Sequence, residues 1–107
     1  KWAAIGLAQT WAMELGPWNI RVNALCPGSV GGERIDRVIT RDATERGVDP
    51  DVIRKIYQRQ SSLRAFASAE DIAAMVCFLV GPGGQMISGQ TIGIDGHTES
   101  LANWLDA

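Results

Sequence analysis

The sequence predicts an α/β fold in which helical segments separate two strands of a parallel sheet. Residues 20–26 alternate apolar and other side chains as a strand does, and residues 91–95 form a second short candidate strand. Helical patterns lie before and between them, an order that points to a parallel sheet. The 107 residues have the length of one small domain, and 46% hydrophobic residues favour a packed core over disorder. Two strands do not make a stable sheet alone, so we expect further strands outside this sequence.

The first predicted helix extends from Trp2 to Leu15 and ends at Gly16-Pro17. Its apolar residues lie on more than one face of the helix: Ala3, Ile5, Leu7, Trp11, Ala12 and Leu15. Such a helix must be covered on several sides, so we expect either a missing partner segment or an oligomer interface. The stretch is too short to span a bilayer and lacks the charged region of a signal peptide. The chain begins at Lys1, without a methionine and inside a helical pattern, and we therefore expect it to be a fragment.

The strand at 20–26 is followed by a glycine-bearing loop and by two amphipathic helices. Pro27-Gly28 ends the strand, and residues 29–32 form the loop. The first helix runs from Glu33 to about Glu45, with Ile35, Val38 and Ile39 on one side. The second begins after Asp49 as N-cap, with Pro50 at its first position, and places Val52, Ile53, Ile56 and Tyr57 at helical spacing. We expect this helix pair to form a lid over roughly residues 31–62.

A capping signal marks the start of the next helix. Ser68-Ala-Glu-Asp71 resembles a capping box, with aspartate in place of the usual glutamate or glutamine. Residues 72–80 are almost wholly apolar, so we expect them to be buried, and the glycines of residues 81–84 end the helix. The strand at 91–95 and a tail complete the chain.

Composition and charge exclude several kinds of site. The formal net charge of -2 argues against a large cationic surface for nucleic acid. Cys26 and Cys77 form no C-x-x-C pair, so we expect reduced, buried thiols in a cytoplasmic protein and no metal site. His97 is the only histidine and has no partner at ligand spacing. We expect it on the surface; a role in an active site or a subunit contact is the alternative.

Charge concentrates in and just after the predicted lid. Eight of the ten Lys and Arg residues lie there: Arg34, Arg37, Arg41, Arg46, Arg54, Lys55, Arg59 and Arg64. Their charge is offset by six acidic residues: Glu33, Asp36, Asp42, Glu45, Asp49 and Asp51. We favour a solvated pair of helices. The alternative is a patch that binds an anionic substrate, such as an acyl carrier or a carboxylate.

Several ordered segments resemble the short-chain dehydrogenase/reductase family. Ile20-Arg-Val-Asn-Ala-Leu-Cys-Pro-Gly-Ser-Val30 is similar to the family's I-R-V-N-x-x-x-P-G-x-V segment. The family's closing stretch is matched by Glu70-Asp-Ile-Ala73, Ile87-Ser-Gly-Gln90 and Ile94-Asp-Gly96. The opening Lys1-Trp-Ala-Ala-Ile-Gly-Leu7 resembles the segment that starts at the family's catalytic lysine. The resemblance covers nearly the whole chain and is weakest from Gly31 to Ser62.

This resemblance implies the C-terminal portion of a doubly wound Rossmann-type parallel sheet with a helical substrate lid. Residues 1–107 would be the C-terminal part of a single domain that binds NAD or NADP. The parent enzyme would interconvert a secondary alcohol and a carbonyl by hydride transfer. The resemblance further implies a small-molecule alcohol or carbonyl substrate and a cytoplasmic homodimer or homotetramer.

The implied catalytic residue of this chain is Lys1. In the family a tyrosine transfers the proton, and a lysine four residues later lowers the pKa of that tyrosine and holds the nicotinamide ribose. The tyrosine, the catalytic serine and the glycine-rich phosphate loop would all precede Lys1, so we expect the chain alone to be inactive.

The implied cofactor-binding residues are Lys1, Pro27, Gly28, Ser29, Val30 and Gly32. The N–H of Val30 would bond the nicotinamide carboxamide, and Gly28 would let the chain approach the ring. Gly32 stands where the family often has threonine, and His97 where a second glycine usually follows Gly96. We expect structural roles for Arg21, Asn23 and Asp95, and core or interface positions for Trp11, Trp18 and Trp104.

Two other functions remain open on the sequence: a non-catalytic binding or oligomerisation module, and a degenerate relative that has lost catalysis. The substrate remains open, because the resemblance places its contacts partly in the variable lid and partly in segments outside this sequence. The choice between NAD and NADP also remains open, because it is made after the second strand of the preceding half.

Overall fold

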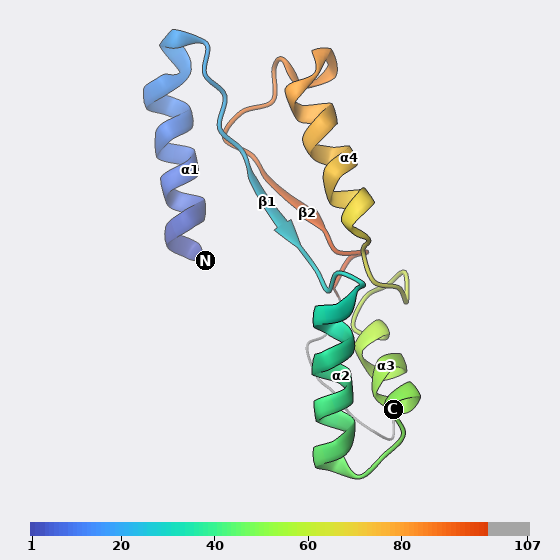
Figure 1. The fold of residues 1–107 in the computed structure, drawn as a ribbon. Coiled ribbons are helices and arrows are strands. Elements are labelled where there is room, and N and C mark those ends of the chain that lie inside the picture. The colour runs from blue at the N-terminus through green and yellow to red at the C-terminus, as the bar shows by residue number, and fades with distance from the viewer. Residues whose placement is uncertain (99–107) are drawn as a thin grey trace.

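A computed structural model of the chain describes residues 1–98 (Figure 1). The elements are α1 (Trp2–Leu15), β1 (Ala24–Pro27), α2 (Glu33–Arg46), α3 (Pro50–Gln58), α4 (Ala69–Val80) and β2 (Thr91–Ile94), with short 3₁₀ turns at Gly16–Trp18 and Pro82–Gly84. All four predicted α-helices are confirmed. The first strand is shorter than predicted at its start and includes Pro27, which was expected to end it.

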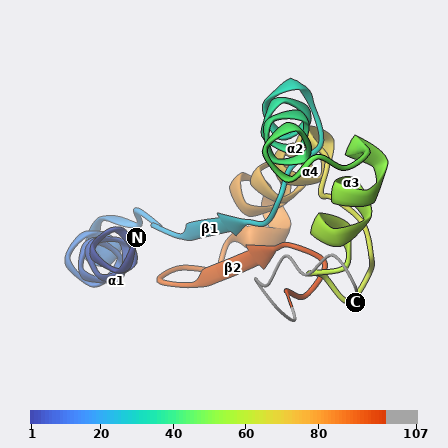
Figure 2. The same ribbon diagram turned by 90° about the horizontal axis from the view of Figure 1, so that it is seen from below.

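β1 and β2 form a parallel pair, as the order of the predicted elements required. The register runs from Ala24 opposite Thr91 to Pro27 opposite Ile94. In both views the strands lie between α1 and α4, and α2 and α3 lie beyond the carboxyl end of β1 (Figures 1 and 2). The α/β class with a parallel sheet is therefore confirmed.

Side-chain hydrogen bonds hold the segment that precedes β1, together with a backbone bond from the N–H of Gly89 to the carbonyl of Val22 at 2.7 Å. The Arg21 guanidinium donates to the carbonyl of Gly84 at 2.6 Å. The Asn23 amide donates to the carbonyl of Ile87 at 2.9 Å and accepts from the N–H of Gln90 at 3.1 Å. These bonds confirm the structural roles predicted for Arg21 and Asn23.

The apolar core lies in the helix pair α2–α3. Its buried members are Ile39, Ala43, Ile53 and Ile56, with Ile35, Val48, Tyr57 and Phe66 packed against them. Local signals set the helix ends. Gly47 ends α2 in the left-handed region (φ 68°), and the Asp49 carboxylate caps α3 by accepting from the N–H of Asp51 at 2.8 Å.

Burial outside this pair differs from the prediction. In α4 only Leu79 is buried, whereas Phe78 is 51% and Val80 73% exposed. Cys77 is exposed and Cys26 half-buried, so the expectation of two buried thiols was wrong. Trp11 and Trp18, 47% and 72% exposed, are not core residues here; Trp104 lies outside the described residues. The physical reason is the same throughout: no described segment covers these apolar faces.

The shape is consistent with this open packing. The radius of gyration is 17.2 Å, against about 13 Å for a compact chain of this length. No residue of α1 is buried. Among the described helices, none has both the length and the apolar character needed to cross a membrane.

Candidate functional site

A cavity of ≈ 790 Å³ opens at the carboxyl end of β1, where ligands bind in open parallel sheets. The start of α1, the loop after β1 and the first turns of α2 form its walls. It is lined by Lys1, Pro27, Gly28, Ser29, Val30, Gly31, Gly32, Glu33, Arg34, Ile35 and Val38. The structure thus brings together all six residues selected from the sequence as catalytic or cofactor-binding.

Backbone hydrogen bonds hold the loop that forms the floor of this cavity. The N–H of Gly28 donates to the carbonyl of Ile94 at 3.0 Å, which continues the pairing of the two strands. Ala67 then bridges the two neighbours of Val30: its N–H donates to Ser29 at 3.0 Å and its carbonyl accepts from Gly31 at 2.8 Å. In such a parallel bridge, the N–H and C=O of Val30 itself point away from Ala67. Among residues 1–98, no backbone hydrogen bond engages them, so they face the cavity rather than the lid segment.

Gly32 explains one departure from the family pattern. It precedes α2 with φ 141°, a backbone conformation that residues with side chains rarely adopt. No atom lies within 4 Å of the position that a Cβ would take. Backbone conformation, rather than lack of space, thus disfavours threonine here. The cavity consequently lacks a hydroxyl at this point and has Arg34 among its lining residues instead.

Lys1 occupies the N-cap position of α1 and is exposed. It also lines a second cavity of ≈ 350 Å³, which Pro27, Gly28 and Ser29 share with the first. Tyr57, Gln60, Ser61 and Asp95 are among the other residues around this second cavity. The lid and the end of β2 therefore face the same lysine as the loop after β1.

Tyr57 connects the second cavity to the lid. Its hydroxyl donates to the Asp42 carboxylate at 3.1 Å, and the guanidinium of Arg46 pairs with the same carboxylate at 2.8 Å. Burial of the ring, followed by the hydrogen bond to Asp42 and the negative charge of Asp42, raises the pKa of Tyr57 above its ordinary value of 10.0. The phenol is therefore protonated at neutral pH.

Several lid charges are paired with one another. Arg54 meets Asp36 at 2.7 Å and Arg37 approaches Glu33 at 4.0 Å, in addition to the pair of Arg46 with Asp42. The side chains of the Arg54–Asp36 and Arg37–Glu33 pairs are substantially solvated, so each of these two pairs contributes little to stability. These pairs agree with the solvated lid favoured on the sequence.

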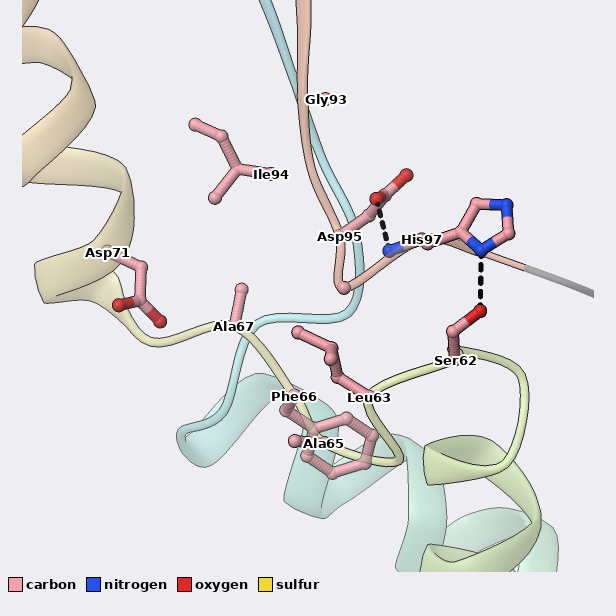
Figure 3. A pocket seen from close by; sticks show the side chains of 11 residues that line it. Ser62, Leu63, Ala65, Phe66, Ala67, Asp71, Gly93, Ile94, Asp95 and His97 are labelled. Carbon is pink, nitrogen blue, oxygen red and sulfur yellow. Dashed lines mark hydrogen bonds between the residues drawn. The ribbon is translucent and has the colours of Figure 1, made fainter.

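A third cavity of ≈ 710 Å³ lies between the start of α4, the end of β2 and the segment after the lid (Figure 3). Hydrogen bonds from the backbone and side chain of Ser68 lower the pKa of Asp71 on its wall, and the predicted capping box is confirmed. His97 is exposed and bonded to Ser62. Within residues 1–98, no group of three or more His, Cys, Asp or Glu side chains could hold a metal ion.

Sequence reasoning did not select Tyr57 or Asp95 as cavity residues. Asp95 could have been found, because it follows β2 and parallel strands end at the same edge of a sheet. Tyr57 carries no such signal, since its apolar spacing in α3 indicates only a core-facing residue.

Known proteins resemble the chain over most of its length. The family described as enoyl-(acyl carrier protein) reductase matches residues 1–97. A short-chain dehydrogenase/reductase of Armillaria gallica is 36% identical over 96 residues, which make up 90% of this chain and 35% of that protein. The chain thus spans about a third of the length of the curated relatives that it matches.

Solved structures share the arrangement of the elements. A short chain dehydrogenase family protein from Francisella tularensis superposes with a TM-score of 0.82 at 30% identity, covering 88% of this chain and 39% of that one. NAD+-bound xylitol dehydrogenase superposes with a TM-score of 0.74 at 31% identity, covering 88% and 38%.

Proposed function

The chain belongs to the short-chain dehydrogenase/reductase family, and from that premise we propose that it is the C-terminal part of an NAD(P)-dependent oxidoreductase domain. The enzyme would interconvert a secondary alcohol and a carbonyl by hydride transfer. The main support for the proposal is the cavity at the carboxyl end of β1, which is lined both by Lys1 and by the loop of residues 27–32.

The residues around this cavity suit a dinucleotide of the kind named in the xylitol dehydrogenase structure. The outward-pointing N–H and C=O of Val30 complement a carboxamide, which has both an acceptor and a donor. Gly28 lets the end of β2 pack against this loop, because a Cβ there would point at Asp95. Pro27, Ser29 and Gly32 complete the floor, and Lys1 would hold ribose hydroxyls. When bound, NAD or NADP would supply or accept the hydride.

Lys1 has a second task in the proposed reaction. As the alcohol is oxidised, its carbon loses a hydride and its oxygen loses a proton. In the family, the tyrosine four residues before the lysine takes that proton. A neighbouring ammonium group favours the phenolate, so Lys1 would lower the pKa of that tyrosine toward the working pH.

The surroundings of the enzyme are part of the same proposal. The substrate would be a small-molecule alcohol or carbonyl compound held under the lid. The exposed apolar residues of α1 and α4, such as Trp11 and Phe78, support contact with other parts of the protein and with further subunits in a homodimer or homotetramer. We place the enzyme in the cytoplasm.

An assay of the full-length gene product tests this function. Purified protein is mixed with NADH or NADPH and a panel of ketones, or with the oxidised dinucleotides and the matching secondary alcohols. The absorbance of the reduced nicotinamide reports turnover, and its fluorescence reports binding. We expect saturable binding of one dinucleotide and turnover with at least one pair of compounds. Failure to bind either dinucleotide would contradict the proposal.

A second candidate is a non-catalytic oligomerisation module, favoured by the absence of buried residues in α1. Light scattering on the 107-residue chain addresses it. A discrete, folded oligomer would support this role, and an unfolded or aggregated sample would count against it.

A further inference from the structure

Hydrogen bonds join the end of β2 to the C-terminal end of the lid, at Ser62 and Leu63 (Figure 3). Ser62 Oγ and Nδ1 of His97 lie 2.5 Å apart. The Ser62 N–H donates to the carbonyl of His97 at 2.7 Å, and the Leu63 N–H donates to the carbonyl of Gly96 at 3.2 Å. Residues 62 and 63 are thus tied to residues 96 and 97 through both backbone and side chain. We call these contacts the Ser62–His97 latch.

His97 adopts a backbone conformation that suits glycine better than histidine. Its φ is 65°, in the left-handed region that side chains disfavour, and the preceding Gly96 has φ 66°. The Asp95 carboxylate supports this turn by accepting from the N–H of His97 at 2.9 Å. Because the backbone alone favours glycine, the imidazole contact with Ser62 is the feature of the latch that specifically uses a histidine.

The latch adjoins the proposed active site. Ser61, the residue before Ser62, is 6% exposed and lines the ≈ 350 Å³ cavity that contains Lys1. Asp95, two residues before His97, lines the same cavity. A shift of Ser62 away from His97 would therefore move the cavity wall that faces Lys1.

We propose that His97 is a positioning residue, which acts through Ser62 to hold the lid's C-terminal hinge against the sheet. With the latch made, Tyr57 and Ser61 keep their places opposite Lys1; with it broken, the lid spends less time in the arrangement that binds substrate. A reduced population of the binding-competent state raises the apparent dissociation constant by the same factor. This inference rests on the proposed function, because only an oxidoreductase would turn over a substrate in this cavity.

Two substitutions of His97 distinguish a role in positioning the lid from a role in folding. His97→Gly keeps the left-handed backbone without strain and removes the imidazole. His97→Asn keeps a side chain that tolerates the left-handed region and can bond Ser62. Both are made in the full-length gene product, with Ser62→Ala as the partner variant. The melting temperature is measured for each variant.

We expect His97→Gly and Ser62→Ala to raise KM by up to about fivefold, the full effect of losing one hydrogen bond, with kcat and the dinucleotide Kd within about twofold of wild type. The probe is the compound of the ketone panel that the wild type reduces fastest. Hydrogen exchange at the amides of Ser62 and Leu63 should also accelerate in His97→Gly, because these amides exchange from the open state of the latch. His97→Asn should restore both readouts to within about twofold of wild type.

Other outcomes overturn the proposal. An unchanged KM in His97→Gly, or a fall in kcat alone with a lower melting temperature, would show that His97 does not position the lid. A wild-type protein that neither binds nor turns over a dinucleotide would instead remove the proposed function. The exchange rates at Ser62 and Leu63 would then still decide whether the latch restrains the hinge.

Discussion

Gly28 lies so close to Asp95 that a Cβ at Gly28 would be 2.7 Å from the Cβ of Asp95 and 2.9 Å from its Cα. These two residues follow the paired ends of β1 and β2, where the N–H of Gly28 still bonds the carbonyl of Ile94 at 3.0 Å. The two chain segments can approach in this way only because Gly28 has no side chain. The floor of the candidate site thus depends on this glycine for its shape.

The first prediction is that Gly28→Ala destabilises the full-length gene product by about 1–3 kcal/mol, the usual cost of forcing a methyl group into a packed site. Denaturant unfolding measures the loss, and dinucleotide affinity should fall with it because the loop must shift. Gly31→Ala is the matched control. Its nearest contact would be 3.8 Å away, an ordinary distance, so stability should change little. Equal effects of the two variants would contradict the reason given.

The second prediction concerns the core between α2 and α3. Ile53 is fully buried there, so Ile53→Ala should cost the lid about 2–5 kcal/mol through lost burial and the cavity left behind. Hydrogen exchange in α2 and α3 measures this local stability in the full-length gene product. The neighbouring Val52 is 41% exposed, and Val52→Ala should change the local stability of the lid by less than about 0.5 kcal/mol. If both variants exchanged like wild type, the core would lie elsewhere.

The helices were predictable because their ends carry local signals. Asp49 with Pro50 marks the start of α3, and Ser68 with Asp71 marks that of α4; both caps form as expected. Burial was not predictable in the same way. The composition of α4 shows that Phe78 is apolar, but which segments cover it depends on parts of the chain distant in sequence, and the described residues leave 51% of its surface exposed.

The candidate site likewise has a part that local sequence predicted and a part that it did not. Pro27, Gly28 and Val30 were selected because contiguous residues match a family motif, and the structure places them around one cavity with Lys1. The contact of Ser62 with His97 joins residues that are 35 positions apart. Neither residue lies in a local pattern that indicates the other, so only the folded chain shows the pair.

The third prediction uses the raised pKa of Tyr57, which burial and Asp42 cause. The folded state holds the phenolic proton more tightly than the unfolded chain, so this contribution to stability is complete below the ordinary tyrosine pKa of about 10. It is lost as the pH rises through the higher, folded value. Thermal unfolding of wild type and Tyr57→Phe across this alkaline range should show a steeper decline for wild type. Parallel curves would indicate that Tyr57 ionises as in the unfolded chain.

The final prediction tests the role proposed for Lys1. Lys1→Met keeps much of the side-chain length and removes the charge, so in the full-length gene product kcat should fall by about 10²- to 10⁴-fold. Without the ammonium group, the pKa of the neighbouring tyrosine should rise, and the pH–rate profile for alcohol oxidation should shift to higher pH. The dinucleotide Kd should also rise through loss of the ribose contact. Lys55→Met is the control, because Lys55 is exposed on α3 and lines neither cavity that contains Lys1. A kcat and pH profile equal to those of the control would remove Lys1 from the catalytic machinery, and the cavity at the carboxyl end of β1 would then have a binding role only.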